Sequence, residues 1–274
     1  MKYPEDFVDK IILGDCLEVM KDIPEHSIDL IITDPPSGKT ACEWDKTPDL
    51  NNMWSEFERI GKEGCVYIFI TIQPFTTDII NSKRNWFKYD WIWNKVNGGN
   101  IMNLKYQPFR THETILIFSK GNIKTFNPQR EYRTLSSLKR YPMGTQATVK
   151  RGSKNKIEHY NIEGIDHPMS EDGKKHPSSI ITFGKYENGV NESKRFDSGF
   201  RHPTRKPVAL YNYLILTYSN ENNIILDPFS GSGTIAISCL QTNRHYIGIE
   251  KEKKYFDMSI KRIESFRNEQ LFNC

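Results

Sequence analysis

Two polar motifs in this chain each follow a short, largely apolar run. Residues 28–33 lead into Asp34-Pro35-Pro36-Ser37, and residues 224–226 lead into Asp227-Pro228-Phe229-Ser230-Gly231-Ser232-Gly233-Thr234. Apolar runs of this length, bounded by turn residues, are typical of buried strands. Because ligands bind at the carboxyl ends of strands in open α/β sheets, we expect two pockets side by side. One is suited to a cofactor and the other to a reacting amine.

The second motif predicts a nucleotide-binding turn. Gly231 and Gly233 let the backbone turn tightly and approach a ligand, and the apolar run that follows starts a helix whose first N–H groups point at that ligand. A further strand over 246–249 ends in Glu250, about 20 residues past the glycines, the spacing at which a carboxylate reaches ribose hydroxyls. The pattern indicates an adenosine-containing cofactor, the alternative being a purely structural turn. No Gly-Lys-Ser/Thr follows, which disfavours a P-loop NTPase.

The first motif suits the activation of a poorly nucleophilic amine. An exocyclic base amine has its lone pair delocalised into the ring, so catalysis needs acceptors for both amine hydrogens. Asp34 offers one acceptor, and successive prolines donate no hydrogen bond and leave carbonyls such as that of Pro35 free. The amine can then attack the methyl group of a sulfonium in line, with no covalent enzyme intermediate. The alternative is an Asp-Pro turn that merely ends a strand.

Four motifs in a fixed order resemble one family. Segments 12–17, 34–36, 202–207 and 227–234 together resemble the circularly permuted beta group of amino DNA methyltransferases, which act on adenine N6 or cytosine N4. The similarity covers roughly residues 8–120 and 200–265, and four ordered motifs are more specific than any one alone. It implies an α/β fold with a Rossmann-like methyltransferase sheet, helices on both faces and an inserted target-recognition region. S-adenosyl-L-methionine is the implied cofactor and double-stranded DNA the implied partner.

The resemblance also implies roles for single residues. Asp34, Pro35, Pro36 and Ser37 match the catalytic motif. Lys206 matches a segment that contacts the methionine portion of the cofactor, where it would pair with the carboxylate. The positions implied to bind the cofactor are Asp15, Cys16, Asp34, Thr204, Lys206, Asp227, Phe229, Ser230, Gly231, Ser232, Gly233, Thr234 and Glu250. A helix-entry Asp is the alternative for Asp15, and a surface lysine at a helix start is the alternative for Lys206.

Ser37 departs from the family pattern. The matching position is nearly always aromatic, and its ring stacks on the base once that base has left the helix. Stacking is worth about 1–3 kcal/mol per base, so its loss lowers the population of the flipped base by roughly fivefold to 150-fold. We expect an active enzyme, either weak or with a substitute ring. Trp44 and Phe109 are the candidate rings.

Composition fits an intracellular enzyme. The 274 residues carry a net charge of only +4, and no apolar run approaches the ~20 residues that span a bilayer. The chain shows no signal peptide, which predicts a cytoplasmic protein acting on DNA, with no membrane partner. The five cysteines are scattered without a Cys-x-x-Cys pair, so we expect reduced thiols and no metal.

The positive charge is concentrated in one region. Residues 121–200 hold 14 Lys and Arg against 9 Asp and Glu, which leaves 24 against 25 elsewhere. No acidic residue lies between Lys139 and Ile157, as expected for a surface that follows phosphates, although a solvated loop would look the same. The residues predicted to bind DNA are Lys139, Arg140, Lys150, Arg151, Lys154 and Lys156.

These pieces predict three parts of the chain. Residues 1–120 form the catalytic half, 121–200 the target-recognition insert and 201–274 the cofactor-binding half. Strands are expected at 66–70, 91–93 and 114–118, separated by stretches long enough for crossover helices. A helix is expected from about Pro207, where apolar residues recur at helical spacing up to Tyr218.

The leading hypothesis is methylation of adenine N6 in DNA. Asp at the start of the motif favours adenine, because cytosine-N4 relatives more often carry Ser there. The alternatives are a cytosine-N4 methyltransferase, a DNA-binding protein that holds the cofactor with catalysis impaired by Ser37, and a methyltransferase acting on RNA or protein glutamine. The resemblance makes a homodimer and a restriction endonuclease partner plausible.

Overall fold

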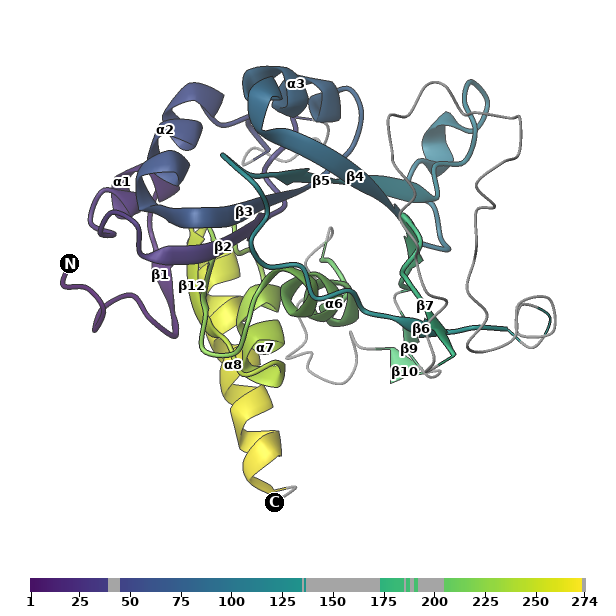
Figure 1. The fold of residues 1–274 in the computed structure, drawn as a ribbon. Coiled ribbons are helices and arrows are strands. Elements are labelled where there is room, and N and C mark those ends of the chain that lie inside the picture. The colour runs from purple at the N-terminus through teal and green to yellow at the C-terminus, as the bar shows by residue number, and fades with distance from the viewer. Residues whose placement is uncertain are drawn as a thin grey trace, which may run out of the picture. The chain divides into compact units, whose positions relative to one another are not determined.

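The computed structural model describes residues 1–38, 45–134, 136, 173–184, 186–187, 190–191 and 205–272. The chain divides into two compact units, one formed by residues 1–127 and 179–274 and the other by 128–178. The larger unit carries both motifs, and Figure 1 traces its sheet and helices.

One eight-stranded sheet organises the larger unit. Its strands lie in the order β1-β12-β11-β2-β3-β5-β4-β8. From β1 to β3 neighbouring strands are parallel, β5 is antiparallel to both β3 and β4, and β8 is parallel to β4. The bounds are β1 (Lys10–Leu13), β2 (Ile28–Thr33), β3 (Gly61–Thr71), β4 (Phe87–Asn94), β5 (His112–Phe118), β8 (Ile180–Thr182), β11 (Ile224–Asp227) and β12 (His245–Glu250).

Helices cover both faces of this sheet (Figure 1). The first face holds α1 (Cys16–Met20), α2 (Leu50–Ile60) and α3 (Phe75–Ser82), and the second holds α6 (Val208–Tyr218), α7 (Thr234–Gln241) and α8 (Lys253–Phe272). Strand β3 shows the alternation that this requires. Tyr67 and Phe69 belong to the first core, whereas Ile68 and Ile70 belong to the second. Side chains alternate along a strand, so a sheet covered on both faces needs an almost continuous apolar run.

The predicted strands and the predicted helix after Pro207 are confirmed, and one connection differs. Strands β3, β4 and β5 contain the expected segments, and α3 with the short turn η1 (Arg84–Trp86) links β3 to β4. Between β4 and β5 the chain forms no crossover helix, only the 3-10 turn η2 (Ile101–Asn103) within a loop. The expectation of a crossover helix there was wrong, because β4 and β5 are antiparallel and need no crossover.

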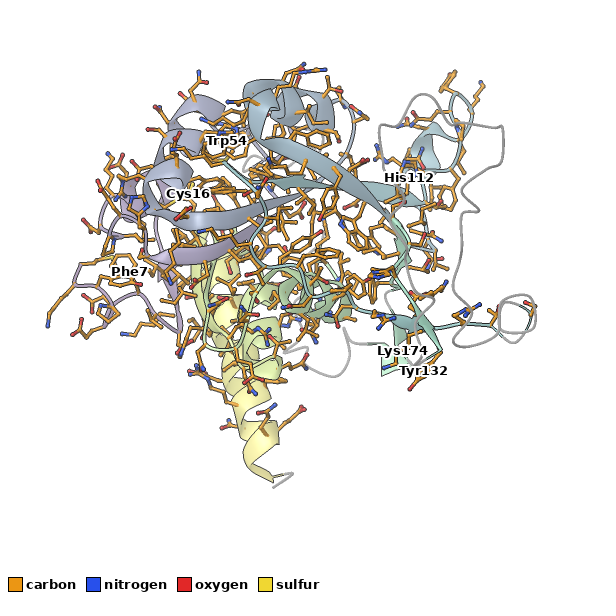
Figure 2. The ribbon with its side chains drawn as sticks, in the orientation of Figure 1. Phe7, Cys16, Trp54, His112, Tyr132 and Lys174 are labelled. Carbon is orange, nitrogen blue, oxygen red and sulfur yellow. The ribbon has the colours of Figure 1, made fainter. Side chains whose placement is uncertain are left out.

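The smaller unit contains one described strand pair. β6 (Glu131–Tyr132) pairs antiparallel with β7 (Lys174–Lys175), and the Lys174 ammonium lies 5.1 Å from the centre of the Tyr132 ring (Figure 2). In the larger unit, β9 (Tyr186–Glu187) pairs with β10 (Val190–Asn191). The six basic residues from Lys139 to Lys156 that were predicted to bind DNA lie outside the described residues. Among the described helices, none combines the length and apolar character needed to cross a membrane.

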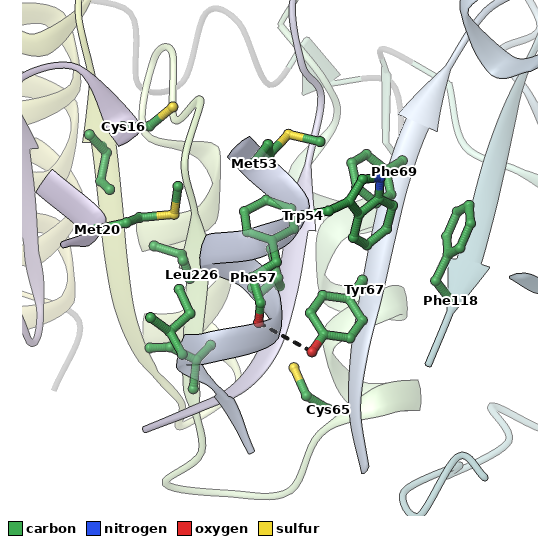
Figure 3. Packing of buried hydrophobic residues seen from close by; sticks show 14 of the residues in the cluster. Cys16, Met20, Met53, Trp54, Phe57, Cys65, Tyr67, Phe69, Phe118 and Leu226 are labelled. Carbon is green, nitrogen blue, oxygen red and sulfur yellow. Dashed lines mark hydrogen bonds between the residues drawn. The ribbon is translucent and has the colours of Figure 1, made fainter. Parts of the chain in front are cut away.

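An aromatic cluster holds α2 against β3 (Figure 3). The Trp54 ring lies 5.1 Å from that of Phe69 and 5.2 Å from that of Phe118, measured between ring centres. The Tyr67 hydroxyl donates to the Phe57 carbonyl at 3.3 Å. Gly61 lies next to this contact, and a Cβ there would meet the Tyr67 hydroxyl and come within 2.9 Å of the Phe57 carbonyl. The contact therefore leaves no room for a side chain where α2 passes into β3.

We expect Gly61→Ala to lower the free energy of unfolding by about 1–3 kcal/mol, because the added methyl group overpacks this contact. Removing the hydroxyl with Tyr67→Phe should reduce that cost. Urea unfolding of both single variants and the double variant gives the coupling free energy between the two substitutions. Strictly additive effects would contradict a clash between the methyl group and the hydroxyl.

Candidate active site

The two motifs meet at one edge of the sheet. β2 and β11 are parallel neighbours, with Leu30 opposite Ile225 and Ile31 opposite Leu226. Their carboxyl ends therefore lie side by side, and a cavity of about 790 Å³ opens there. Both motifs line this cavity. The two expected pockets are one continuous space, because adjacent strands are only about 4.8 Å apart.

Most predicted site residues line the cavity. Those that do are Asp15, Cys16, Asp34, Pro35, Pro36, Ser37, Lys206, Phe229, Ser230, Gly231, Ser232, Thr234 and Glu250. Asp227 and Gly233 are absent from the lining. Thr204 lies outside the described residues. The structure thus brings together residues from both ends of the sequence at the carboxyl ends of β2, β11 and β12.

Asp227 and Gly233 shape the turn between β11 and α7. The Asp227 side chain is 2% exposed and its Oδ1 accepts from the Phe229 N–H at 3.1 Å. Burial raises the pKa of Asp227 to about 8. Gly233 has a φ of 73°, and a Cβ there would lie 2.9 Å from the Ser259 Cβ. Both its conformation and its close contact with α8 therefore require glycine.

Glu250 supplies hydrogen-bond acceptors beside the glycine turn. Its Oε2 accepts from the Gly231 N–H at 2.8 Å and its Oε1 from the Glu252 N–H at 2.7 Å. Burial raises the pKa of Glu250, and these two N–H groups act in the opposite direction. Each carboxylate oxygen keeps a second lone pair, so hydroxyl groups of a ligand can still donate to it. The Ser230 hydroxyl nearby is buried and has no hydrogen-bond partner in the described part of the chain. A polar ligand therefore fits this end of the cavity.

Asp15 is the N-cap of α1, as the helix-entry alternative proposed, and it also lines the cavity. Its Oδ1 accepts from the Leu17 N–H at 3.0 Å, and its Oδ2 pairs with the Lys251 ammonium at 3.0 Å. The pKa of Asp15 is lowered, because the Lys251 ion pair and the Leu17 N–H outweigh the desolvation that would raise it. Burial raises the pKa of the neighbouring Cys16 thiol to about 12, so this cysteine is a neutral wall residue.

Asp34 stands at the end of a chain of four alternating charges. The Lys206 ammonium donates to Asp34 Oδ2 at 2.5 Å and lies 3.3 Å from Glu113 Oε2. Glu113 Oε1 in turn pairs with the Lys95 ammonium at 2.9 Å. The Asp34 side chain is 27% exposed, whereas those of Lys206 and Glu113 are only 10% and 12% exposed. Lys206 is therefore a buried cation held between two carboxylates.

Burial and the neighbouring charges set the protonation of each group. Burial raises the pKa of Asp34 to about 6, with Lys206 opposing that shift and Glu113 adding to it. Desolvation alone would raise the pKa of Glu113, but attraction to Lys206 and Lys95 lowers it. The two carboxylates likewise raise the pKa of Lys206 against the effect of its burial. At neutral pH Asp34 is ionised and keeps acceptor capacity toward the cavity.

The backbone after Asp34 is fixed by a second carboxylate. The N–H groups of Ser37 and Gly38 donate to Asp45 Oδ1 at 2.7 and 2.9 Å. Asp45 is 7% exposed, and its negative charge also acts to raise the pKa of Asp34. The two proline residues and this clamp together define the path of the chain along the cavity wall.

Only one of the two proposed substitute rings belongs to the described residues. Phe109 is absent from the lining, and its ring packs on Gly98, where a Cβ would lie 2.6 Å from the ring edge. Trp44 lies outside the described residues. The lining does contain the buried rings of Phe75, Trp93 and Tyr211.

Reasoning from the sequence missed Lys95, Glu113, Asp45 and Arg110. Glu113 and Lys95 lie where the antiparallel strands β5 and β4 approach the cavity, and in the sequence each appears as a charge next to an apolar run. Arg110 lines the same cavity. A single charged residue at a strand end is common in proteins, so this signal alone could not have selected them.

Comparison with known proteins identifies the family of this chain. A family model described as DNA methylase, N6_N4_Mtase, matches residues 28–261. The type II methyltransferase M.HinfI of Haemophilus influenzae is 31% identical, covering 96% of this chain and 70% of that protein. The DNA adenine methyltransferase YhdJ of Escherichia coli (strain K12) is 30% identical, covering 93% of this chain and 82% of that protein.

Solved structures support the fold. The M1.HpyAVI–SAM complex superposes with a TM-score of 0.57 at 24% identity, over 92% of this chain and 98% of that one. The cytosine-N4-specific PvuII DNA methyltransferase superposes with a TM-score of 0.61 at 16% identity, over 94% and 90%. Since the family model spans most of the sequence, this chain belongs to the N6_N4_Mtase family of DNA methylases.

Proposed function

We propose that this protein transfers a methyl group from S-adenosylmethionine to adenine N6 in double-stranded DNA, directly and without a covalent enzyme intermediate. The observation that carries the proposal is that Asp34-Pro35-Pro36, the glycine turn and Glu250 all line one cavity. One wall offers acceptors for an amine, and the other suits a nucleoside cofactor.

The cavity fits the cofactor in size and in chemistry. Its volume of about 790 Å³ lies within the usual range for small-molecule sites. Glu250 is positioned to accept hydrogen bonds from ribose hydroxyls, the turn at Gly231 permits close backbone approach, and Phe229 and Cys16 supply apolar wall. When bound there, S-adenosylmethionine supplies an electrophilic methyl group.

The residues around Asp34 would act on the amine. Lys206 occupies Oδ2 of Asp34, so Oδ1 is the oxygen available to accept one amine hydrogen. The carbonyl of Pro35 would accept the other. With both hydrogens engaged, the nitrogen lone pair is drawn out of the ring and toward the methyl group. As the new N–C bond forms and the S–C bond breaks, the nitrogen loses one proton, which Asp34 receives and passes to water.

Adenine is preferred over cytosine as the target base. YhdJ, which is 30% identical to this chain, is named a DNA adenine methyltransferase. Asp at the start of the catalytic motif also favours adenine. Cytosine N4 stays the alternative, because the same pair of acceptors can bind any exocyclic amine.

Wider roles follow from the family. We infer that residues within 121–200, including the basic stretch 139–156, read the DNA sequence. A homodimer and a restriction endonuclease partner also stay predictions; M.HpaI of Haemophilus parainfluenzae, 29% identical over 93% of this chain and 74% of that protein, is named a type II methyltransferase.

The direct test is transfer of labelled methyl from S-adenosylmethionine to unmethylated genomic DNA, followed by identification of the product nucleosides. We expect N6-methyladenine, and no product from Asp34→Ala that still binds the cofactor. N4-methylcytosine would keep the class and change the base. Cofactor binding with no transfer to DNA would instead support a catalytically silent DNA-binding protein, and transfer to RNA alone would overturn DNA as substrate.

The fall in activity at low pH, the acid limb of the pH profile, should report the protonation of Asp34. We expect the single-turnover rate to fall as pH drops through about 6, because protonated Asp34 loses an acceptor. Glu113→Gln removes a charge that raises this pKa and should shift the limb to lower pH. Lys206→Met removes a charge that lowers it and should shift the limb to higher pH. Shifts in the same direction for both variants would contradict this electrostatic assignment.

The serine at position 37 should limit the rate. We expect Ser37→Tyr to raise the single-turnover rate by about fivefold or more, because the ring stacks on the extruded base. Ser37→Ala serves as the control, since it adds no ring. A tyrosine variant that folds and binds the cofactor but is no faster would show that the missing ring is already replaced.

A further inference from the structure

The loop between β4 and β5 is internally braced. Its ends are joined by the Lys95 N–H, which donates to the Thr111 carbonyl at 2.7 Å. Asn100, only 7% exposed, donates through Nδ2 to the Pro108 carbonyl at 3.0 Å and accepts at Oδ1 from the Arg110 N–H at 2.8 Å. These bonds tie both ends of the segment 100–110 together, so the turn at its tip is held by the loop itself.

The tip of this loop exposes apolar side chains. Ile101 is 68% exposed, Met102 92% and Tyr106 82%. Burying such side chains is favourable, so a cluster presented to water on a braced turn indicates a surface that binds a partner. The base of the same loop, at Asn97, Gly98, Gly99 and Arg110, lines the cavity that contains Asp34.

The charge of the loop identifies the partner as DNA. Residues 95–112 contain Lys95, Lys105 and Arg110 and no Asp or Glu. Arg110 adds a second observation, because its Nε is buried with no hydrogen-bond partner in the described part of the chain. Lys95 and Lys206, on the same cavity wall, are both paired with carboxylates. A half-buried cation that lines the cavity and has no carboxylate partner among the described residues points to an anion carried by the ligand, and a nucleotide entering the cavity brings its phosphate.

We propose that loop 95–111 enters the DNA beside the target base. Ile101, Met102 and Tyr106 fill the space that the base leaves in the stack, and Arg110 binds the phosphate of the target nucleotide. Apolar side chains inserted between base steps offset the lost stacking of the duplex. Filling the gap in the duplex favours the extruded state of the base. An aromatic ring at position 37 would favour the same state from within the cavity, but Ser37 provides none. The proposal rests on the proposed methylation of DNA.

The test of the tip uses the sequence that the wild-type protein methylates, first mapped on genomic DNA. Two synthetic duplexes carry it, one with the target adenine paired and one with it mispaired, where extrusion costs less. We expect the double variant Met102→Ser, Tyr106→Ser to lose about tenfold to 100-fold in single-turnover rate on the paired duplex. On the mispaired duplex it should stay within about threefold of wild type. The matched variant Met102→Leu, Tyr106→Phe keeps the apolar surface and should behave as wild type on both.

Arg110 is tested by salt dependence. Arg110→Met and the control Lys261→Met, on the exposed face of α8, each remove one positive charge. We expect the slope of log affinity for duplex DNA against log salt to fall by about 1 for Arg110→Met and not for the control. Affinity for S-adenosylmethionine should stay unchanged. An unchanged slope with weakened cofactor binding would overturn the phosphate assignment and place Arg110 on the cofactor.

The outcomes separate this proposal from the proposed function. A wild-type protein that methylates no DNA would overturn the function itself. Active wild type with an unaffected tip variant, or with a variant that loses equally on both duplexes, would overturn only the insertion of the loop.

Discussion

The parallel pairing of β2 with β11 is the constraint on which the site depends. Neighbouring strands are separated by one hydrogen-bonded spacing, so whatever follows them in the chain must share one edge of the sheet. Asp34 and the glycine turn are far apart in the sequence, yet this register places them on one cavity. The two helical layers bury both faces of the sheet, so the strand ends are the part of the sheet open to a ligand.

Much of this arrangement could be predicted from the sequence, because it depends on local patterns. The apolar runs gave the positions of β2, β11 and β12, and the periodicity after Pro207 gave α6. The antiparallel β4–β5 pair was missed, since strand direction does not appear in an apolar run. Lys206 was expected to bind a cofactor carboxylate, and the structure pairs it with Asp34 and Glu113. Such contacts depend on the conformations of long side chains from three distant segments, which no spacing rule describes.

The charge chain around Asp34 solves an electrostatic problem. An isolated carboxylate in a partly buried cavity would be protonated too readily to serve as an acceptor. Lys206 counters this effect, but a buried ammonium also needs more than one partner. Glu113 supplies the second partner and Lys95 neutralises Glu113, so two cations balance two anions. Each member therefore acts on the protonation of its neighbour, and only Asp34 need contact the reacting base.

The hairpin connection between β4 and β5 has a consequence for how proteins of this kind diversify. A parallel crossover must span the sheet with a helix of matching length, whereas an antiparallel hairpin can lengthen or shorten freely at its tip. Doubling the length of a flexible loop costs only about 0.6 kcal/mol in closure entropy. Insertions, deletions and substitutions at the tip of this loop, between Ile101 and Tyr106, can thus accumulate without moving Asp34, Glu113 or the glycine turn. Selection can change how such a protein engages its substrate while the chemistry stays the same.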